Sequence, residues 1–256
     1  MEIILHDGQE FALGCMPRSA AVGSVRPCLA EAMTLIPKDK WEPCDFSDLV
    51  PPVPSQGSHG SCVGHQCTDA VQTARVIAGM PSVALSPWDL YSQICGGRDG
   101  GANIHDALSV LQGRGVSTLA ACPDYTLHAK DAARDADAKK HQTTESFDCP
   151  DRPSIATAVQ LRFPTPLGIQ IYGNFTSLES IKGKPCVPKP AGRLRGGHCV
   201  LGCGLDYIAG VWMVKIATKS WGLDFGDQGC VWYQIDWIDN SYADGWCVRA
   251  VTISDE

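Results

Sequence analysis

The positions of the apolar residues predict three helices in the first half of the chain. Between about residues 61 and 79 they recur at spacings of three and four, as on one face of a buried helix that ends at Gly79. Ser86 followed by Pro87 is typical of a helix start, and Asn103 is expected to cap a third helix over "NIHDALSVLQGRG". The predicted apolar face of the first helix comprises Val63, Cys67, Ala70, Val71, Ala74 and Ile77.

The second half of the chain predicts strands. After a polar, Ala/Asp/Lys-rich insert at about 128–145, short β-rich runs are bounded by Gly, Asp and Pro: "PLGIQIY", "HCVLGCGLDY", "VWMVKIAT", "CVWYQI" and "CVRAVTI". Helices followed by mostly antiparallel strands indicate an α+β fold of two lobes, a helical one at about 55–127 and a β-rich one at about 150–253. We expect both lobes to form one domain, 41–256, preceded by an extended strap at 1–40.

Composition and charge narrow the function classes. The 256 residues carry a formal net charge of −7 and no basic cluster, which argues against a nucleic-acid partner. The apolar run in "MEIILHDGQE" is too short for a signal peptide, and no later run approaches the ~18 residues of a membrane span. We therefore expect a protein without a membrane partner that is made and folded in the cytosol, with most of its thirteen cysteines reduced.

The stretch "SQGSHGSC", residues 55–62, places a glutamine ahead of a cysteine that begins the first predicted helix. A helix N-terminus favours the thiolate form, so Cys62 suits a nucleophile, and the amide of Gln56 could join its backbone N–H in stabilising an oxyanion. His198, at the start of a predicted strand after two glycines, is the candidate base. Each residue alone has a plainer explanation, because a buried thiol acts as a small apolar group and a single histidine is commonly structural.

These pieces, in this order, resemble the papain-like cysteine peptidases of the C1 family, in particular compact bacterial and phage members with a short N-terminal segment. "QGSHGSC" is similar to the family's run around its cysteine, "GGHCVLGCGLDY" to its histidine strand, and "KSWGLDFGDQGCVWY" to its Asn-Ser-Trp-Gly segment. "LSPWDLY" and "DGGANIHDALSVLQGRGVSTLAACPDY" resemble segments between them, so the resemblance covers about 40–253. The spacing of Cys62 and His198 also falls within the ~130–150 residues expected of such enzymes.

The resemblance implies a papain-like fold with an active-site cleft between the lobes, and a role for each matching residue. Cys62 would attack the peptide carbonyl, His198 would form a thiolate–imidazolium pair with it and protonate the leaving amine, and Gln56 would stabilise the oxyanion. Trp221 would shield the pair from water. The remaining residues implied to bind the substrate are Gly100, Gly101, Gly197 and Cys199. We expect neither a cofactor nor a metal ion.

The sequence departs from the family at Lys219, where the family has its catalytic asparagine. An asparagine offers an amide oxygen to the histidine N–H, whereas a lysine ammonium has only donors, and its charge would lower the pKa of His198. Two outcomes stay open. Either Lys219 swings out and Thr218, a water or a backbone carbonyl orients His198, or the site is degraded and the fold is retained for binding.

We therefore expect a cysteine peptidase that hydrolyses peptide bonds through a covalent acyl-enzyme, with a polypeptide as its substrate or as a partner in the cleft. The alternative is a catalytically attenuated subunit of a larger assembly such as a phage particle, in which case the protein would be incorporated in a virion. Transpeptidation and amidase activity at the same site stay open. His59, which stands where the family has a disulfide-forming cysteine, and His65 are expected to be satisfied polar residues, with a proton relay or a metal site as the alternative.

Overall fold

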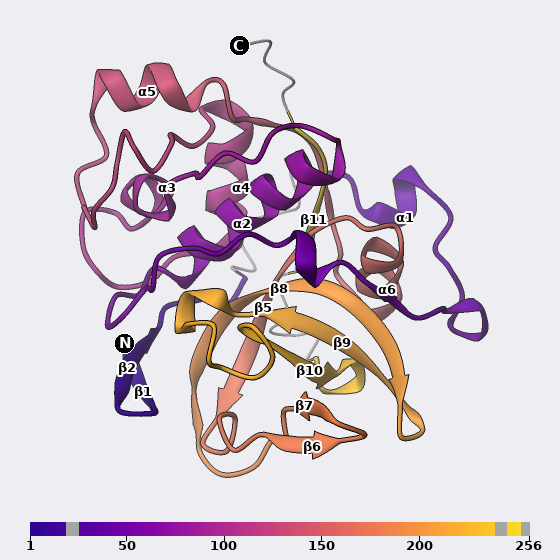
Figure 1. The fold of residues 1–256 in the computed structure, drawn as a ribbon. Coiled ribbons are helices and arrows are strands. Elements are labelled where there is room, and N and C mark those ends of the chain that lie inside the picture. The colour runs from indigo at the N-terminus through magenta and orange to yellow at the C-terminus, as the bar shows by residue number, and fades with distance from the viewer. Residues whose placement is uncertain (19–25, 239–244, 252–256) are drawn as a thin grey trace.

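The computed structural model describes residues 1–18, 26–238 and 245–251. Most of the helices gather in one lobe and the largest sheet forms the other, as the sequence predicts (Figure 1). The helix at residues 152–160 packs on that sheet, and the strands at 143–148 and 246–251 pair with each other and pack against helices. The helices are α1 Leu29–Ala32, α2 Cys62–Ile77, α3 Pro87–Ile94, α4 Ile104–Gly113, α5 Ala132–Ala138 and α6 Arg152–Gln160. Short 3-10 turns lie at Lys38–Lys40, Ser47–Leu49, Lys219–Trp221 and Ile235–Trp237.

The sheet lobe is organised around one long strand, β8. Its seven strands follow the order β3-β8-β9-β10-β7-β6, and β5 pairs with β8 beside this path. The pairing is antiparallel except between β7 and β10. The strands of the structure are β1 Glu2–His6, β2 Gln9–Leu13, β3 Cys44–Asp45, β4 Thr143–Asp148, β5 Thr165–Tyr172, β6 Glu179–Ile181, β7 Lys184–Cys186, β8 Leu194–Ile208, β9 Val211–Ala217, β10 Cys230–Gln234 and β11 Trp246–Val251.

Helix α2 lies between the lobes and is buried from Cys62 to Arg75. It packs against α3 and α4 on one side and against β8 and β11 on the other, so polar as well as apolar side chains are enclosed. The predicted apolar face is buried except for Ile77, which is 37% exposed because the packed part of the helix has ended before it. The prediction for Ile77 was wrong. The first residue of this helix is consequently held at the boundary of the two lobes.

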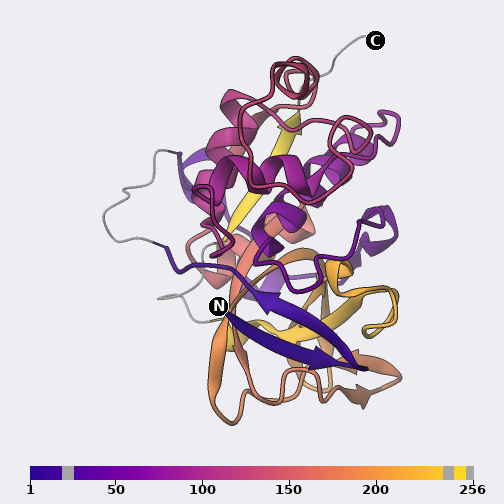
Figure 2. The same ribbon diagram turned by 90° about the vertical axis from the view of Figure 1, so that its left-hand side faces the viewer.

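The predicted extended strap begins with a hairpin. Strands β1 and β2 pair in antiparallel register, and Asp7 and Gly8 form the turn with φ angles of 47° and 78°. Positive φ at both central residues is typical of the tight turns that match the twist of a hairpin. The hairpin lies against the sheet lobe, and the chain continues from β2 along the boundary between the lobes (Figure 2).

Three helices, α1, α5 and α6, arise where the sequence analysis expected none. In the polar insert, the side chain of Asp131 accepts hydrogen bonds from the first backbone N–H groups of α5. Helix α6 begins with a capping box formed by Asp151 and Ser154. Asn103 does occupy the position before α4, but its side chain makes no capping hydrogen bond, unlike Ser86 before α3.

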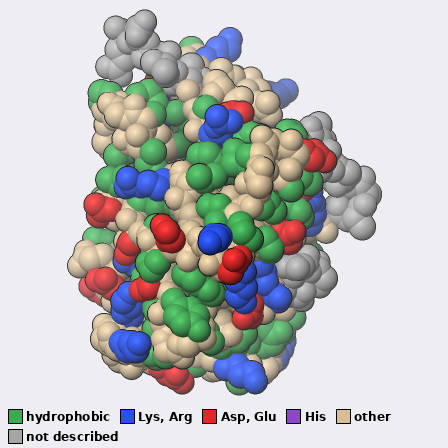
Figure 3. All heavy atoms as spheres, turned by 90° about the vertical axis from the view of Figure 1, so that its right-hand side faces the viewer, with side chains coloured by type: hydrophobic (Ala, Val, Ile, Leu, Met, Phe, Trp, Pro, Cys, Tyr) green, Lys and Arg blue, Asp and Glu red, His purple; other side chains and the backbone are tan. Residues whose placement is uncertain are grey.

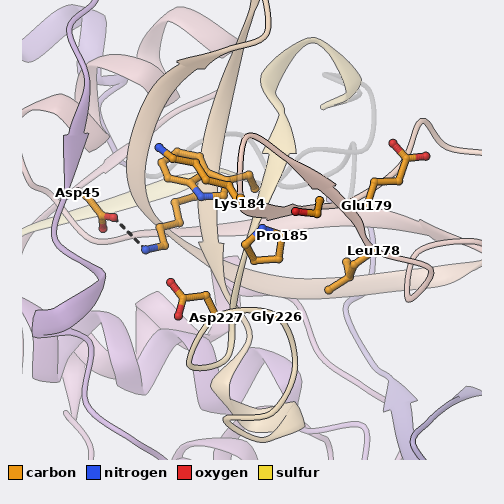
Figure 4. Close-up of a pocket in the computed structure, with 11 residues that line it drawn as sticks. Asp45, Leu178, Glu179, Lys184, Pro185, Gly226 and Asp227 are labelled. Atoms are coloured by element: carbon orange, nitrogen blue, oxygen red, sulfur yellow. Dashed lines mark hydrogen bonds and ion pairs between the residues drawn. The ribbon is translucent and has the colours of Figure 1, made fainter.

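A cavity of about 630 Å³ opens on the sheet lobe beside β3, β7 and β10 (Figure 4). Its charged groups are largely paired: Lys215 Nζ lies 2.8 Å from an oxygen of Asp45, and Lys184 is paired with Asp206. None of the residues predicted to form the active site lines it. On the face seen in Figure 3, acidic and basic side chains are interspersed. None of the helices described is long and apolar enough to cross a membrane.

Candidate active site

Cys62 is the first residue of α2 and is completely buried. Its thiol lies against backbone N–H groups of Val63, of Cys199 on β8 and of Gly14 in the N-terminal part of the chain. Burial raises the pKa of this thiol to about 12, and the nearby thiol of Cys15 contributes in the same direction. In this state of the molecule, Cys62 is therefore protonated at neutral pH.

The side chain of Gln56 is oriented by Ser220. The hydroxyl of Ser220 donates to Gln56 Oε1 at 2.8 Å, and the backbone N–H of Gln56 donates to the Ser220 carbonyl at 2.9 Å. Because Oε1 accepts from Ser220, the amide nitrogen Nε2 is the end of the side chain that donates elsewhere. Gln56 Nε2 donates to the backbone carbonyl of Ala12 at 2.9 Å and to that of His59 at 3.2 Å. A peptide carbonyl thus already occupies the donor that the sequence predicts for an oxyanion.

His198 lies on β8, fully buried, with its imidazole 4.5 Å from the ring of Trp221, centroid to centroid. Its Nε2 is 3.0 Å from the hydroxyl oxygen of Thr218. A proton on Nε2 can be donated to this hydroxyl, which leaves Nδ1, for which the structure shows no hydrogen-bond partner, as the basic nitrogen. Burial lowers the pKa of His198 to about 3, and the imidazole of His65 adds to the effect. The imidazole is therefore neutral here.

Lys219 does not take the place of the family's asparagine at His198. Its ammonium is directed to the backbone carbonyls of Val50 and of Ser47, the latter at 3.4 Å. Of the groups expected to orient His198, the hydroxyl of Thr218 is the one that the structure places within hydrogen-bond distance. The Lys219 charge acts instead on buried Asp69: burial raises the pKa of that carboxyl well above its ordinary value, and Lys219 opposes the rise.

Residues 12–16, which we call the strap segment, cross the site between the two lobes. Their backbone is hydrogen-bonded to the loop before α2, to the loop before α4 and to β8. The four bonds are Ala12 N–H to Gly57 O (3.2 Å), Cys15 N–H to Gly197 O (3.0 Å), Ala102 N–H to Gly14 O (2.8 Å) and Met16 N–H to Ala102 O (3.0 Å). The strap segment therefore fills the groove in which a substrate backbone was expected.

Glycines allow this close approach of backbones. A Cβ atom on Gly14 would lie 2.1 Å from the carbonyl oxygen of Gly60, and one on Gly101 would lie 2.3 Å from that of Gly14. Gly101 also has a φ of +91°, which side chains disfavour. Of the residues predicted to line the groove, Gly101, Gly197 and Cys199 contact the strap segment, whereas Gly100 is exposed.

A family model described as papain family cysteine protease matches residues 39–243. The chain belongs to this family. Among solved structures, xylellain, a cysteine protease from Xylella fastidiosa, is 24% identical, with a TM-score of 0.75 over 97% of this chain and 100% of that chain. A procathepsin B from Trypanosoma congolense is 14% identical, with a TM-score of 0.72 over 94% and 87% of the two chains. The digestive procathepsin L 3 of Tenebrio molitor is 19% identical, with a TM-score of 0.63 over 93% and 75%.

This papain-family chain has a hydrogen bond between a histidine and an aspartate where the sequence lacks the family's cysteine. His59 Nδ1 lies 3.1 Å from Asp99, and the His59 ring stacks on Tyr125 with centroids 3.6 Å apart. Asp99 also accepts from the backbone N–H of Gly60 at 2.9 Å, so it ties the loop before α4 to the loop before Cys62. Among the described residues, no group of three or more His, Cys, Asp or Glu side chains could hold a metal ion.

The sequence analysis missed the aromatic contacts that dock the strap on the papain-family site. Phe11, at 1% exposure, stacks on Trp221 with ring centroids 5.4 Å apart. Phe225 and Phe175 complete the surroundings of Trp221 at 5.4 and 5.8 Å. Trp221 itself is buried, as expected of a residue that shields the histidine from water. The run of three apolar residues at the end of β2 was the available signal for Phe11.

The free energy of unfolding should fall in acid because His65 is buried without a charge. Burial lowers its pKa from 6.5 to about 4, so between these pH values the unfolded chain binds a proton that the folded protein does not. His65→Gln keeps a donor for the Ser61 carbonyl but removes this titration. We expect the parent to lose roughly 2–3 kcal/mol more than the variant between pH 7 and pH 4, measured by urea unfolding. The raised pKa of Asp69 acts in the opposite direction but is common to both proteins. Parallel curves for parent and variant would contradict the prediction.

The ammonium of Lys219 should contribute to stability rather than impair catalysis. Lys219→Met keeps the apolar stem but leaves the Val50 carbonyl without its lysine donor and the Ser47 carbonyl with the Val50 N–H alone, which we expect to cost about 1–3 kcal/mol in urea unfolding. Lys219→Asn should be equally destabilised and should not increase turnover, because Thr218 already contacts His198. The exposed Lys38→Met is the matched control. A more active, equally stable Lys219→Asn protein would show that the lysine attenuates the site.

Proposed function

We propose that this chain is a cysteine peptidase that hydrolyses peptide bonds through a covalent acyl-enzyme. The observation that carries the proposal is the 3.0 Å contact between His198 Nε2 and the Thr218 hydroxyl, together with the direction of the Lys219 ammonium toward Val50. A hydroxyl oxygen accepts a hydrogen bond as an asparagine amide oxygen does, so the loss of the family's asparagine does not leave the base unsupported.

In the proposed reaction, the proton of the Cys62 thiol passes to His198 Nδ1 and the thiolate attacks the peptide carbonyl carbon. Gln56 Nε2 and the backbone N–H of Cys62 donate to the oxyanion, while Ser220 keeps the glutamine amide in its orientation. The imidazolium then gives the proton from Nδ1 to the leaving amine, and the thioester forms. A water that gives a proton to Nδ1 then attacks the thioester, and the Cys62 thiolate leaves and takes that proton back from Nδ1 as the acid product departs. The Thr218 hydroxyl accepts a hydrogen bond from the Nε2–H group throughout, and so stabilises the imidazolium.

Under this proposal, the structure represents a latent state of the peptidase, in which the substrate groove is blocked. The strap segment supplies backbone partners along the groove and places the Ala12 carbonyl on Gln56, so a substrate must displace it. Displacement admits water to Cys62 and His198 and removes much of the burial that keeps both groups neutral. The closed strap therefore blocks substrate and also disfavours the thiolate–imidazolium pair.

Turnover of a peptide mixture tests the proposal. A Gly14→Ala protein, in which the strap segment cannot close on Gly60, is incubated with a defined mixture of peptides, and products are identified by mass. We expect hydrolysis, and a transient thioester on Cys62 that hydroxylamine releases. Cys62→Ala should abolish both, whereas Cys122→Ala, which changes a buried cysteine in another part of the fold, should not.

A second proposal, a catalytically attenuated binding subunit, is favoured by the occupied groove. In that case the strap segment would be a permanent part of the site, and a larger assembly such as a virion would be the context. It predicts no Cys62-dependent hydrolysis in the Gly14→Ala protein. The two proposals thus differ in the outcome of one experiment.

A further inference from the structure

Four cysteines from three parts of the chain meet at the candidate site. Cys15 belongs to the strap segment, Cys62 and Cys67 to α2, and Cys199 to β8. The thiols of Cys15 and Cys67 lie close enough to that of Cys199 to raise its pKa, and the thiol of Cys62 lies near that of Cys15. No disulfide joins any of the thirteen cysteines, all of which lie in the described residues.

The backbone of the strap segment sets the Cys15 side chain against β8. The N–H of Cys15 donates to the carbonyl of Gly197 at 3.0 Å, and Gly197 and Cys199 are two residues apart, on the same face of the strand. Ala102 fixes the residues on either side of Cys15 through two further hydrogen bonds. The main-chain hydrogen bonds of the strap segment therefore hold Cys15 beside the part of β8 that carries Cys199.

This pair differs from the other thiol pairs of the protein in what it would connect. Cys149 and Cys247 lie close together at the paired strands β4 and β11, so a disulfide there would join elements that already form one sheet. Cys15 and Cys199 instead join the strap segment to the wall of the groove. A bond between them would hold closed the part of the molecule that must move before a substrate binds.

We propose that Cys15 and Cys199 form a reversible disulfide that locks the strap segment over Cys62. The inference rests on the proposed function, since it regulates access to the same site. With a low-molecular-weight disulfide as oxidant, the Cys15 thiolate attacks one of its sulfurs, giving a mixed disulfide and releasing one thiol. The Cys199 thiolate then attacks the Cys15 sulfur and releases the second thiol. The protons lost by the Cys15 and Cys199 thiols end on the two departing thiolates. Overall, one S–S bond forms and one breaks, and two electrons pass from the protein to the oxidant.

The order of these steps follows from exposure. Cys15 is 5% exposed and its neighbour Met16 is 37% exposed, whereas Cys199 is completely buried. The oxidant therefore reaches Cys15 first, during partial lifting of the strap segment. When the strap segment closes again, the mixed disulfide on Cys15 comes within reach of the Cys199 thiol. Reduction by a small thiol follows the reverse course and frees the strap segment again.

The test compares full-length protein treated with oxidised glutathione and with dithiothreitol. Thiols are blocked with N-ethylmaleimide at low pH, and peptides are mapped without reduction. We expect a linked peptide pair containing Cys15 and Cys199 after oxidation. We also expect carbamidomethylation of Cys62 by iodoacetamide, followed residue by residue with isotopic labels, to slow about tenfold or more. Both effects should disappear in Cys15→Ser and in Cys15→Ala, and persist in the matched control Cys149→Ser.

The outcomes are separable from the proposed function because none of these readouts requires peptide hydrolysis. A Cys15–Cys62 or Cys67–Cys199 link in place of Cys15–Cys199 would overturn the assignment, as would oxidation that leaves Cys62 equally reactive. If the Cys15–Cys199 link forms and the reduced Gly14→Ala protein hydrolyses no peptide, the disulfide stands and the peptidase proposal fails.

Discussion

Replacing Thr218 by valine is expected to lower kcat/KM for peptide hydrolysis by roughly 10²-fold, because the imidazole loses the acceptor that orients it. Valine matches threonine in shape but cannot accept the proton on His198 Nε2, which the Thr218 hydroxyl meets at 3.0 Å. The imidazolium formed during acylation then has a buried, unpartnered N–H. The measurement is steady-state hydrolysis of a fluorogenic peptide in the Gly14→Ala background, where the strap segment does not limit the rate.

Thr218→Ser is the matched control, since it keeps the hydroxyl and removes only a methyl group. We expect its kcat/KM to lie within about fivefold of the parent, and both variants to unfold at similar urea concentrations. An active Thr218→Val protein would show that another group holds His198. Loss of activity in both variants would show that threonine acts through packing rather than through its hydroxyl.

Replacing Gly14 by alanine is expected to speed the alkylation of Cys62 by roughly 10²-fold or more, because the strap segment can no longer close. The new Cβ would lie 2.1 Å from the carbonyl oxygen of Gly60. The backbone of residue 14 fixes the Cβ position and the oxygen belongs to the backbone of Gly60, so neither atom can move aside as a flexible side chain can. Opening the strap segment hydrates Cys62, whose pKa burial holds at about 12, so the reactive thiolate becomes more populated at neutral pH.

The rate is measured with iodoacetamide by following the Cys62 peptide between pH 6 and 10. In the parent we expect the rate still to rise at the upper end of this range, whereas in Gly14→Ala it should level off at a lower pH. Glu10→Ala, which changes an exposed residue of β2, is the control and should behave as the parent does. Unchanged alkylation in Gly14→Ala would mean that the strap segment does not govern access to Cys62.

The parts of the fold that carry local signals could be predicted from the sequence. The start of α3 depends on a serine cap followed by proline, and α2 depends on apolar residues at helical spacing, both of which are encoded within a few residues. Gln56 and Cys62 belong to one short motif, so they were found together. The hairpin turn at Asp7 and Gly8 carried an equally local signal, an Asp-Gly pair between two short apolar runs, which the sequence analysis overlooked.

The parts that depend on long-range contacts could not be predicted. The direction of the Lys219 ammonium is decided by the carbonyls of residues 47 and 50. Thr218 contacts His198 because β8, which carries His198, pairs with β9, which ends just before Thr218. The pairing of the strap segment with Ala102 and Gly197 involves backbone atoms, which leave almost no trace in residue types. Only the glycines at 14, 60 and 101 mark it, and their meaning emerges when the three are seen together.

Labelling with a peptidyl epoxide tests most directly the central claim, that Cys62 and His198 form a competent pair beneath the strap segment. The Gly14→Ala protein is incubated with the probe at neutral pH, and the adduct is located by intact mass and peptide mapping. We predict a single adduct on Cys62 that forms slowly in the parent, rapidly in Gly14→Ala, and much more slowly when His198→Ala is added. A folded Gly14→Ala protein that gains no Cys62 adduct, or one that reacts equally well without His198, would contradict the account.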